Sequence, residues 1–206
     1  MFTLTVDHEI SIRTLHPDDA EGLFQLVERN RSRLRPWIGS SSLPETAKIT
    51  RIYTIECYLG SLDPLTAIDT PYIDEVRPYF PPPHPPMDMG IWFSGELAGV
   101  ITLSILEDSD TAAEFGYWID GKHEGKGIVT RCVRALMDYA IDNLGMERFI
   151  IGCARNNLRS CAVPERLGYR LQAILPNGEV VGEFVYDRAV YEIQSTEWRL
   201  RKKANV

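Results

Sequence analysis

The chain has 206 residues, of which 44% are hydrophobic and 25% are charged, and its formal net charge is -7. This composition is ordinary for a globular protein and excludes the disordered, collagen-like and membrane-spanning classes. The acidic balance also disfavours nucleic acid or an anionic membrane as a partner, because phosphate binding requires concentrated lysine and arginine.

The four cysteines form no C-x-x-C pair and lie in apolar segments, at Cys57, Cys132, Cys153 and Cys161. This pattern is typical of reduced, buried thiols and does not indicate a metal site. The first residues lack the basic region and apolar stretch of a signal peptide, and no window approaches the ~18 apolar residues of a membrane span. We therefore expect a cytoplasmic protein, with residues 1–206 forming one domain that carries an insertion.

The first third of the chain predicts a strand followed by helices. Residues 9–15 alternate between apolar and polar side chains, as in a half-buried strand. The segment HPDD at 16–19 then favours a helix start, and apolar residues recur at helical spacing after it. A second helical stretch is expected over 31–37, and a third from about 43 to 59.

Residues 60–87 sustain neither period and concentrate proline, aspartate and tyrosine. The run from Pro81 to Pro86 predicts a locally extended polyproline II conformation, because proline fixes φ and disfavours helix in the residue before it. We interpret this segment as an insertion or a long loop. A functional lid and a linker both remain open from the sequence.

Three consecutive strands are expected over 89–93, 96–105 and 111–120. A long helix follows over 125–145, and Gly145 is suited to end it. One face of this helix is apolar and predicts contact with the core; it carries Ile128, Cys132, Leu136, Tyr139 and Ala140.

The last part of the chain predicts a buried strand over 147–154 and a short helix over 156–168 that Gly168 closes. A terminal hairpin is expected next, with strands over 169–175 and 180–193 joined by a turn at Asn177–Gly178. The tail after this hairpin favours a last helical turn with a basic end.

A glycine-rich turn lies where the third of the central strands meets the long helix. Gly125 and Gly127 allow backbone N–H groups to point inward, and the positive end of a helix favours an anion. The turn therefore predicts a phosphate or pyrophosphate site, although a plain connection is an alternative. No serine or threonine follows Lys126, which excludes a Walker loop, and the third glycine of a dinucleotide fingerprint is missing.

The turn resembles motif A of the GNAT acetyltransferases, with Gly125 and Gly127 matching and Lys122 at the position usually held by Gln or Arg. Residues 157–169 are similar to the N-x-x-S-x-x-V-x-E-x-L-G-F segment of the RimJ/RimL branch. The segments AEFGYWID and VERNRSRLRPWI resemble a strand and the N-terminal helical region of that branch. Together these similarities cover most of the chain except 60–87.

The resemblance implies the GNAT fold, which is an α/β (α+β) fold with a mixed central sheet flanked by helices and splayed at the glycine-turn and helix cofactor site. It also implies acetyl-CoA as cosubstrate and an N-acetyltransferase that acts on a primary amine, either a protein N-terminus or a small amine. The amine would attack directly within a ternary complex. The identity of the acceptor and the assembly, including a homodimer, are left open. The alternative is a non-catalytic module of the same fold that docks partners through the proline-rich insertion.

The resemblance further implies which residues hold the coenzyme. The pyrophosphate would lie on backbone amides of residues 124–129, Lys122 would contact phosphate, and Asn157 would bind the pantetheine. A strand N–H near Tyr117 or Trp118 would polarise the thioester carbonyl. The implied set is Tyr117, Trp118, Lys122, Glu124, Gly125, Lys126, Gly127, Ile128, Val129, Asn157 and Ser160.

Glu114 and Ser160 are the two candidates for proton transfer. Strand alternation places Glu114 opposite an apolar set, so that its carboxylate is suited to receive the amine proton, directly or through water; an ordinary salt-bridged glutamate is the alternative. The resemblance implies that Ser160 donates a proton to the coenzyme sulfur, with helix capping as the alternative for Ser160 and Asn157. His123 is expected to face solvent. The apolar set is Ala113, Phe115, Tyr117 and Ile119.

Overall fold

The computed structural model describes residues 2–39, 43–60, 87–106 and 109–204, so nearly all of the predicted insertion at 60–87 lies outside the described residues. The chain divides into two compact units, each with its own core. The first unit contains Met1–Thr102 and Tyr117–Ile128, and the second contains Leu103–Gly116 and Val129–Val206. Strands β4 (Glu96–Ile105) and β5 (Ala112–Ile119) therefore contribute residues to both units.

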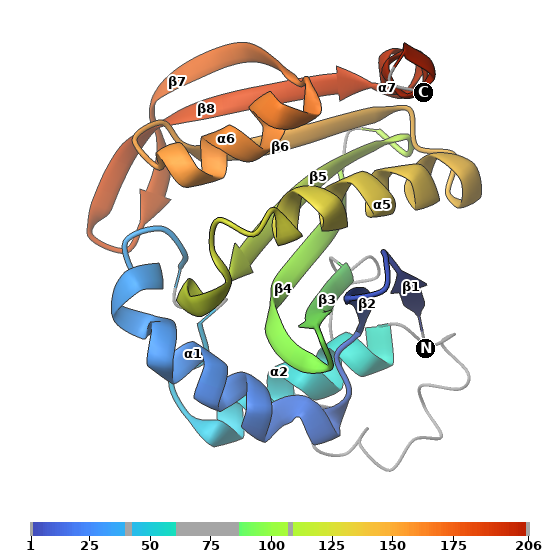
Figure 1. Cartoon of the computed structure of the whole chain (residues 1–206). Coiled ribbons are helices and arrows are strands. Elements are labelled where there is room, and N and C mark those ends of the chain that lie inside the picture. The colour runs from blue at the N-terminus through green and yellow to red at the C-terminus, as the bar shows by residue number, and fades with distance from the viewer. Residues whose placement is uncertain (1, 40–42, 61–86, 107–108, 205–206) are drawn as a thin grey trace. The chain divides into compact units, whose positions relative to one another are not determined.

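The first unit combines antiparallel strands with two helices that lie side by side (Figure 1). β1 pairs with β2, and β2 pairs with β3, both antiparallel. The predicted strand at 9–15 is confirmed as β2, whereas β1 was not predicted because its three residues show no buried periodicity. The elements are β1 (Thr3–Thr5), β2 (Ile10–Thr14), η1 (Pro17–Asp19), α1 (Ala20–Leu34), α2 (Ala47–Gly60), β3 (Met87–Phe93) and the 3-10 turn η4 (Gly121–His123).

The second unit is built on strands in the order β5-β6-β8-β7. β5 and β6 are parallel, whereas β6/β8 and β8/β7 are antiparallel, which confirms the prediction of a mixed sheet flanked by helices. In Figure 1, α5 and α6 lie on the same face of these strands. The elements are α5 (Ile128–Asn143), β6 (Arg148–Ala154), α6 (Leu158–Leu167), β7 (Arg170–Val181), β8 (Phe184–Gln194) and α7 (Ser195–Ala204).

Each unit buries its own set of apolar side chains. In the second unit Phe115 and Phe149 stack with ring centroids 5.7 Å apart, and Cys132, Leu136 and Ala140 of α5 are buried. The core of the first unit consists of Leu15, Leu23, Leu26, Val27, Leu34, Leu43, Val100 and Trp118. Among the described helices, none has both the length and the hydropathy needed to span a bilayer.

Two predicted helix boundaries are wrong for local reasons. The stretch 31–37 does not begin a second helix, because α1 continues to Leu34 and the Arg35 N–H donates to the carbonyl of Arg31 at 2.9 Å. The long helix starts at Ile128 rather than at residue 125. Gly125 and Gly127 both adopt positive φ angles, which cannot continue into a right-handed helix.

The terminal hairpin turns at 182–183, not at Asn177–Gly178 as predicted. β7 continues through this pair with an irregular register between Leu175 and Glu179. Asn177 has a φ of 53°, and its N–H donates to the Asp187 carboxylate at 3.2 Å. The Asn-Gly pair therefore makes a bulge, because a side chain on the facing strand holds it within the ladder.

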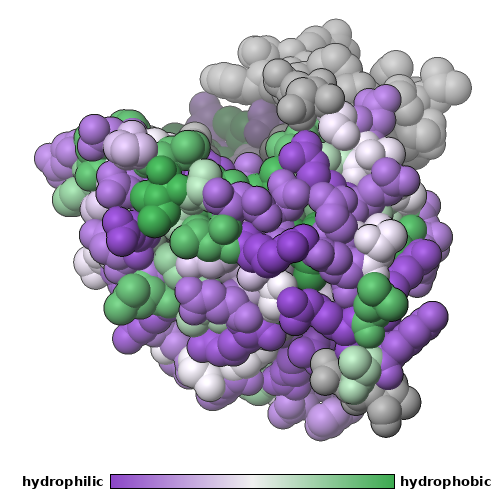
Figure 2. Space-filling model, turned by 90° about the horizontal axis from the view of Figure 1, so that it is seen from above, coloured by the Kyte–Doolittle hydropathy of each residue, from purple (hydrophilic) through white to green (hydrophobic). Residues whose placement is uncertain are grey.

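The surface of this hairpin exposes apolar side chains. Figure 2, which views the molecule from above Figure 1, shows hydrophobic groups scattered among hydrophilic ones. Large apolar residues that are more than one-third exposed on β7 and β8 are Leu171, Ile174, Leu175, Val180 and Val185.

A carboxyl group is partly buried within the first unit, where Asp88 of β3 lies against α2 and β4. The Thr102 hydroxyl donates to the Asp88 carboxylate. Burial raises the pKa of Asp88, while hydrogen bonds from Thr102 and Tyr53 act in the opposite direction. Burial also raises the pKa of the neighbouring Tyr53 hydroxyl.

We expect Asp88→Asn to stabilise the protein at neutral pH. A carboxyl whose pKa is raised on folding contributes stability below its unfolded pKa of about 3.9, and this contribution is lost as the pH rises through the folded pKa. Asparagine keeps an acceptor for Thr102 and removes the partly buried charge. The melting temperature should rise by about 2 °C or more at pH 7 and match that of the wild type near pH 3. A lower melting temperature at pH 7 would contradict this assignment.

Candidate active site

The glycine turn presents an open backbone. Gly125 and Gly127 have φ angles of 74° and 70°, and a Cβ at either position would meet nothing within 4 Å. Both glycines are exposed, and Ile128 behind them is buried as the first residue of α5. Backbone N–H groups in such a turn form a concave donor set that fits an anion such as a diphosphate.

A buried polar hub ties the start of this turn to α1. The Asn30 amide accepts from the Gly121 N–H at 3.0 Å and donates to the Asp120 carboxylate at 3.0 Å. Arg29 donates to the other oxygen of Asp120 at 2.6 Å. Burial by itself raises the pKa of Asp120, but hydrogen bonds from Arg29 and Asn30 outweigh it and lower the pKa overall. Sequence analysis did not find this hub, because its partners are about 90 residues apart.

Two charged side chains of the turn are already paired within the protein. Glu124 accepts from the Arg33 guanidinium at 2.6 Å, and the same guanidinium donates to the carbonyl of Ile119. Lys122 pairs with Glu96 at 2.8 Å, and both side chains are largely exposed. The predicted contact of Lys122 with phosphate therefore requires this exposed ion pair to open.

The expectation that His123 faces solvent is wrong, because its side chain is only 8% exposed. The ring packs edge-on against Phe93 at 5.2 Å, and Nδ1 lies 3.3 Å from the Lys126 ammonium. Nε2 is buried without a hydrogen-bond partner among the described residues. Burial lowers the pKa of His123 first, and Lys126 and Lys122 lower it further. The ring therefore fills space beneath the turn as a neutral group.

Trp118 belongs to the apolar core of the first unit, and the Tyr117 side chain is half-buried. β4 approaches closely beside them, since a Cβ on Gly99 would lie 3.0 Å from the Cα of Ile119. Glycine at position 99 therefore lets the two backbones meet at the strand end that precedes the turn.

Glu114 is a salt-bridged residue of the second unit. The Arg188 guanidinium donates to Glu114 and, through its other terminal nitrogen, to Glu179 at 3.2 Å. Ala113 and Phe115 are buried opposite Glu114, as the alternation predicted. That pattern does not continue along β5, because Tyr117 and Ile119 are half-buried and Trp118 is buried instead.

Asn157 caps α6, since its side chain accepts from the Ser160 N–H at 3.3 Å. Ser160 is therefore not the capping residue, and its hydroxyl hydrogen-bonds the Cys153 thiol. The Cys153 and Cys161 sulfurs lie 3.1 Å apart. Burial raises the pKa of the Cys153 thiol, and the Cys161 contact raises it further. Val129, the remaining candidate of this unit, is half-buried in α5.

The two proton-transfer candidates lie on opposite faces of the second unit's sheet. Glu114 pairs across the sheet with Ile150, so the two residues share a face. Cys153, which contacts Ser160, is an odd number of residues further along β6 and therefore lies on the other face, which α5 and α6 cover.

One edge of β6 loses a strand partner part of the way along. β5 pairs with β6 only from Ala112 to Glu114, opposite residues 148–150. From Ile151 to Ala154, β6 pairs with β8 on its other edge, and its pairing with β5 does not extend this far among the described residues. Main-chain groups on the β5 side of this segment are therefore suited to pair with an extended ligand.

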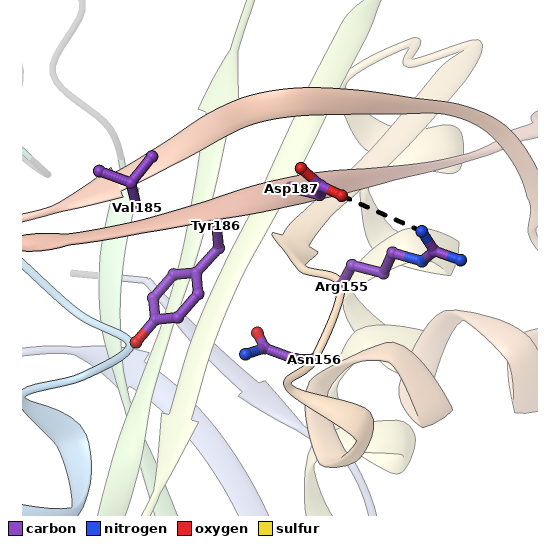
Figure 3. A pocket seen from close by; sticks show the side chains of 5 residues that line it. All are labelled: Arg155, Asn156, Val185, Tyr186 and Asp187. Atoms are coloured by element: carbon purple, nitrogen blue, oxygen red, sulfur yellow. Dashed lines mark ion pairs between the residues drawn. The ribbon is translucent and has the colours of Figure 1, made fainter.

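A pocket of about 410 Å³ opens where β6 ends, and the sequence did not predict it. Figure 3 shows Arg155 and Asp187 pointing toward each other, with Asn156 and Tyr186 directed into the same space. The Arg155 guanidinium lies 4.0 Å from the Asp187 carboxylate. In the sequence, the feature that could have indicated this pocket is the polar pair Arg155 and Asn156, which follows an apolar strand and precedes Asn157. Val185 completes the lining.

Comparisons with known proteins agree with this geometry. Residues 9–170 match the family model described as "Acetyltransferase (GNAT) domain". The chain is 33% identical to the "Putative ribosomal N-acetyltransferase YdaF" of Bacillus subtilis (strain 168), covering 98% of this chain and 100% of that protein. The crystal structure of a "Probable acetyltransferase" is 32% identical, with a TM-score of 0.74 over 96% of this chain and 99% of that one. A ribosomal L7/L12 alpha-N-protein acetyltransferase, RimL, in complex with coenzyme A shares the fold at 24% identity and a TM-score of 0.75, covering 94% and 98% of the two chains.

Proposed function

This chain belongs to the GNAT acetyltransferase family, and from that premise we propose that it transfers the acetyl group of acetyl-CoA to a primary amine. The observation that supports this function best is the exposed turn with Gly125 and Gly127 in left-handed conformations. The turn offers main-chain donors to a diphosphate without obstruction by any Cβ. Bound acetyl-CoA would supply the activated thioester.

The coenzyme would be held by main-chain groups more than by side chains. Amides of residues 124–129 would bind the diphosphate, and the free edge of β6 beyond Ile150 would pair with the pantetheine amides. Asn157 would bind the pantetheine at the start of α6 while its side chain keeps its capping hydrogen bond to the Ser160 N–H. Lys122 would leave its exposed pair with Glu96 to approach a phosphate, and this exchange costs little because exposed ion pairs are weak.

The proton steps would occur on the two faces of the sheet. Glu114 receives the proton of the amine, while Ser160 donates to the departing thiolate from the α6 side. In direct attack within a ternary complex the amine displaces the CoA thiolate at the thioester carbon, so no enzyme nucleophile is acetylated. A main-chain N–H near Tyr117 or Trp118 would polarise the thioester carbonyl.

We propose a protein N-terminus as the acceptor; the Bacillus subtilis relative is named a putative ribosomal N-acetyltransferase, which supports a protein acceptor. An α-amine, with a pKa of about 7.7–8.0, is partly neutral at physiological pH, whereas a lysine amine, with a pKa near 10.4, needs stronger base assistance. A single salt-bridged glutamate fits the easier substrate better.

Domain organisation, cellular location, partners and assembly are proposed from other features of the chain. The chain would act as one domain, since β4 and β5 have residues in both units. Its four free cysteines suit the reducing cytoplasm, and its net charge of -7 argues against a nucleic-acid partner. The exposed apolar side chains of β7 and β8 would supply the interface of a homodimer.

Acetyl-CoA turnover tests the proposal directly. Acetyl-CoA at 100 times its Kd should stabilise the protein by about 2.7 kcal/mol, seen as a rise in melting temperature. Release of the CoA thiol should then be detected with a panel of N-terminal peptides, polyamines and amino acids. No thermal shift at millimolar ligand would count against the function, and binding without turnover of any acceptor would favour the docking module.

Ser160→Ala is expected to lower kcat about 100-fold or less, with little change in the Kd of acetyl-CoA, because the lost hydroxyl acts on the leaving group. Leu158→Ala is a matched control in the same turn of α6, where the side chain is 75% exposed. Steady-state kinetics and calorimetry separate the two constants. An equal loss in both variants would assign Ser160 a structural role only.

A further inference from the structure

The contacts of Arg188 exceed what a surface ion pair requires. Its guanidinium uses one terminal nitrogen for Glu114 on β5 and the other for Glu179 on β7. The side chains of Glu114 and Arg188 are each 29% exposed, so the cluster is partly screened from solvent. A planar guanidinium held at both ends fixes the carboxylates it binds more narrowly than an ammonium group does.

Gly152 on the intervening strand makes room for this arrangement. β6 lies between β5 and β8, and a Cβ on Gly152 would lie 2.6 Å from Cζ of Arg188. The guanidinium therefore lies flat over β6 in the space that any other residue would fill. Glycine is unfavourable within a strand, so its presence here is explained by the approach of Arg188 across the sheet.

We infer that Arg188, seated over Gly152, is the positioning residue that holds Glu114 for proton acceptance from the amine. Glu114 has a long, flexible side chain, and its ion pair with Arg188 selects one orientation on the face of the sheet opposite Ser160. Glu179 anchors the far side of the guanidinium. This inference rests on the proposed function and adds residues that the sequence did not point to.

The same face carries a pair suited to be a control. Arg148 and Glu192 lie 3.5 Å apart, with side chains that are 33% and 24% exposed. Glu192 pairs with Ile150, as Glu114 does, so both ion pairs occupy one face of the sheet. Removing Arg148 therefore reproduces the loss of a half-buried cation without touching Glu114.

Two independent substitutions test the inference. Arg188→Met removes the cation. Gly152→Ala displaces the Arg188 guanidinium but substitutes no charged residue, so the net charge of the protein is unchanged. Each should lower kcat about 10-fold or more at pH 7, with an unchanged KM for acetyl-CoA. Neither should cause a further loss when combined with Glu114→Gln, because Arg188 acts through that carboxylate. Arg148→Met and Gly22→Ala, whose added Cβ meets nothing within 4 Å, should keep wild-type kinetics.

Wild-type turnover is measured first, and crystal structures of the variants accompany the kinetics. Wild-type protein that turns over no amine would remove the proposed function and the inference together. Wild-type turnover that Arg188→Met and Gly152→Ala leave unchanged would overturn the inference alone. It would also be overturned by losses that persist in the Glu114→Gln background, or by a Gly152→Ala structure in which the guanidinium still contacts Glu114.

Discussion

Replacing both Gly125 and Gly127 with alanine is expected to weaken acetyl-CoA binding between about 30-fold and several hundred-fold. Both residues have φ angles near 70°, where an L side chain costs roughly 1–2 kcal/mol per residue. The space around them is empty, so the penalty arises from backbone strain and not from a clash. Two such penalties amount to about 2–4 kcal/mol against the conformation that binds the diphosphate, and each 1.4 kcal/mol is tenfold in affinity. Calorimetric titration with CoA measures the loss.

Gly145→Ala is the matched control for this double substitution. Gly145 has a φ of 68° and equally empty surroundings, but it follows the end of α5. Its replacement should lower the melting temperature through the same strain and leave the CoA affinity of the folded protein unchanged. If the double variant bound CoA like the wild type, the turn would be a plain connection and the assignment of the coenzyme site would fail.

Removing the carboxylate of Asp120 is expected to lower the free energy of unfolding by roughly 1–3 kcal/mol, the cost of leaving a buried hydrogen-bonding group unsatisfied. Asp120 is 4% exposed, and it accepts hydrogen bonds from Arg29 and Asn30. In Asp120→Ala the Asn30 amide remains buried with one donor unsatisfied, and the half-exposed guanidinium of Arg29 loses its partner. Urea denaturation measures the effect.

The pH dependence of this hub has a defined sign. The pKa of Asp120 is lowered on folding, so its contribution is present above the unfolded pKa of about 3.9 and is lost as the pH falls through the lower folded value. The Asp120→Ala deficit should therefore shrink in strong acid. Asp142→Ala is the control, since the exposed Arg199–Asp142 pair should contribute less than about 1 kcal/mol. If the two variants lost the same free energy of unfolding, the hub at Asp120 would stabilise the fold no more than an exposed ion pair does.

The resemblance carried by four segments of the chain anticipated the family, and the family model confirmed it. Helix and strand positions followed from periodicity, and β4 was predicted to the residue at Glu96–Ile105. Errors arose where a distant group decided the outcome. The Asn177–Gly178 pair has the residues of a tight turn, yet Asp187 on the facing strand holds it as a bulge.

The catalytic candidates show the same limit. The sequence left Glu114 open between a base and a salt-bridged residue, and Arg188, 74 residues further along, supplies the ion pair. Ser160 and Asn157 were equal candidates for capping α6, and the structure assigns that role to Asn157. The roles of Glu114 as proton acceptor and of Ser160 as proton donor stay predictions.

By itself, the sequence determined the features that depend on a few neighbouring residues: the two glycines that open a backbone turn, the apolar face of α5 and the closure of α6 by Gly168. Only the tertiary structure decided which charges meet. The hub at Asp120, the seat of Arg188 over Gly152 and the opposite faces of Glu114 and Ser160 depend on strand register and helix packing. Local conformation is limited by the sterics of each residue, whereas an ion pair forms wherever folding brings two side chains within a few ångströms.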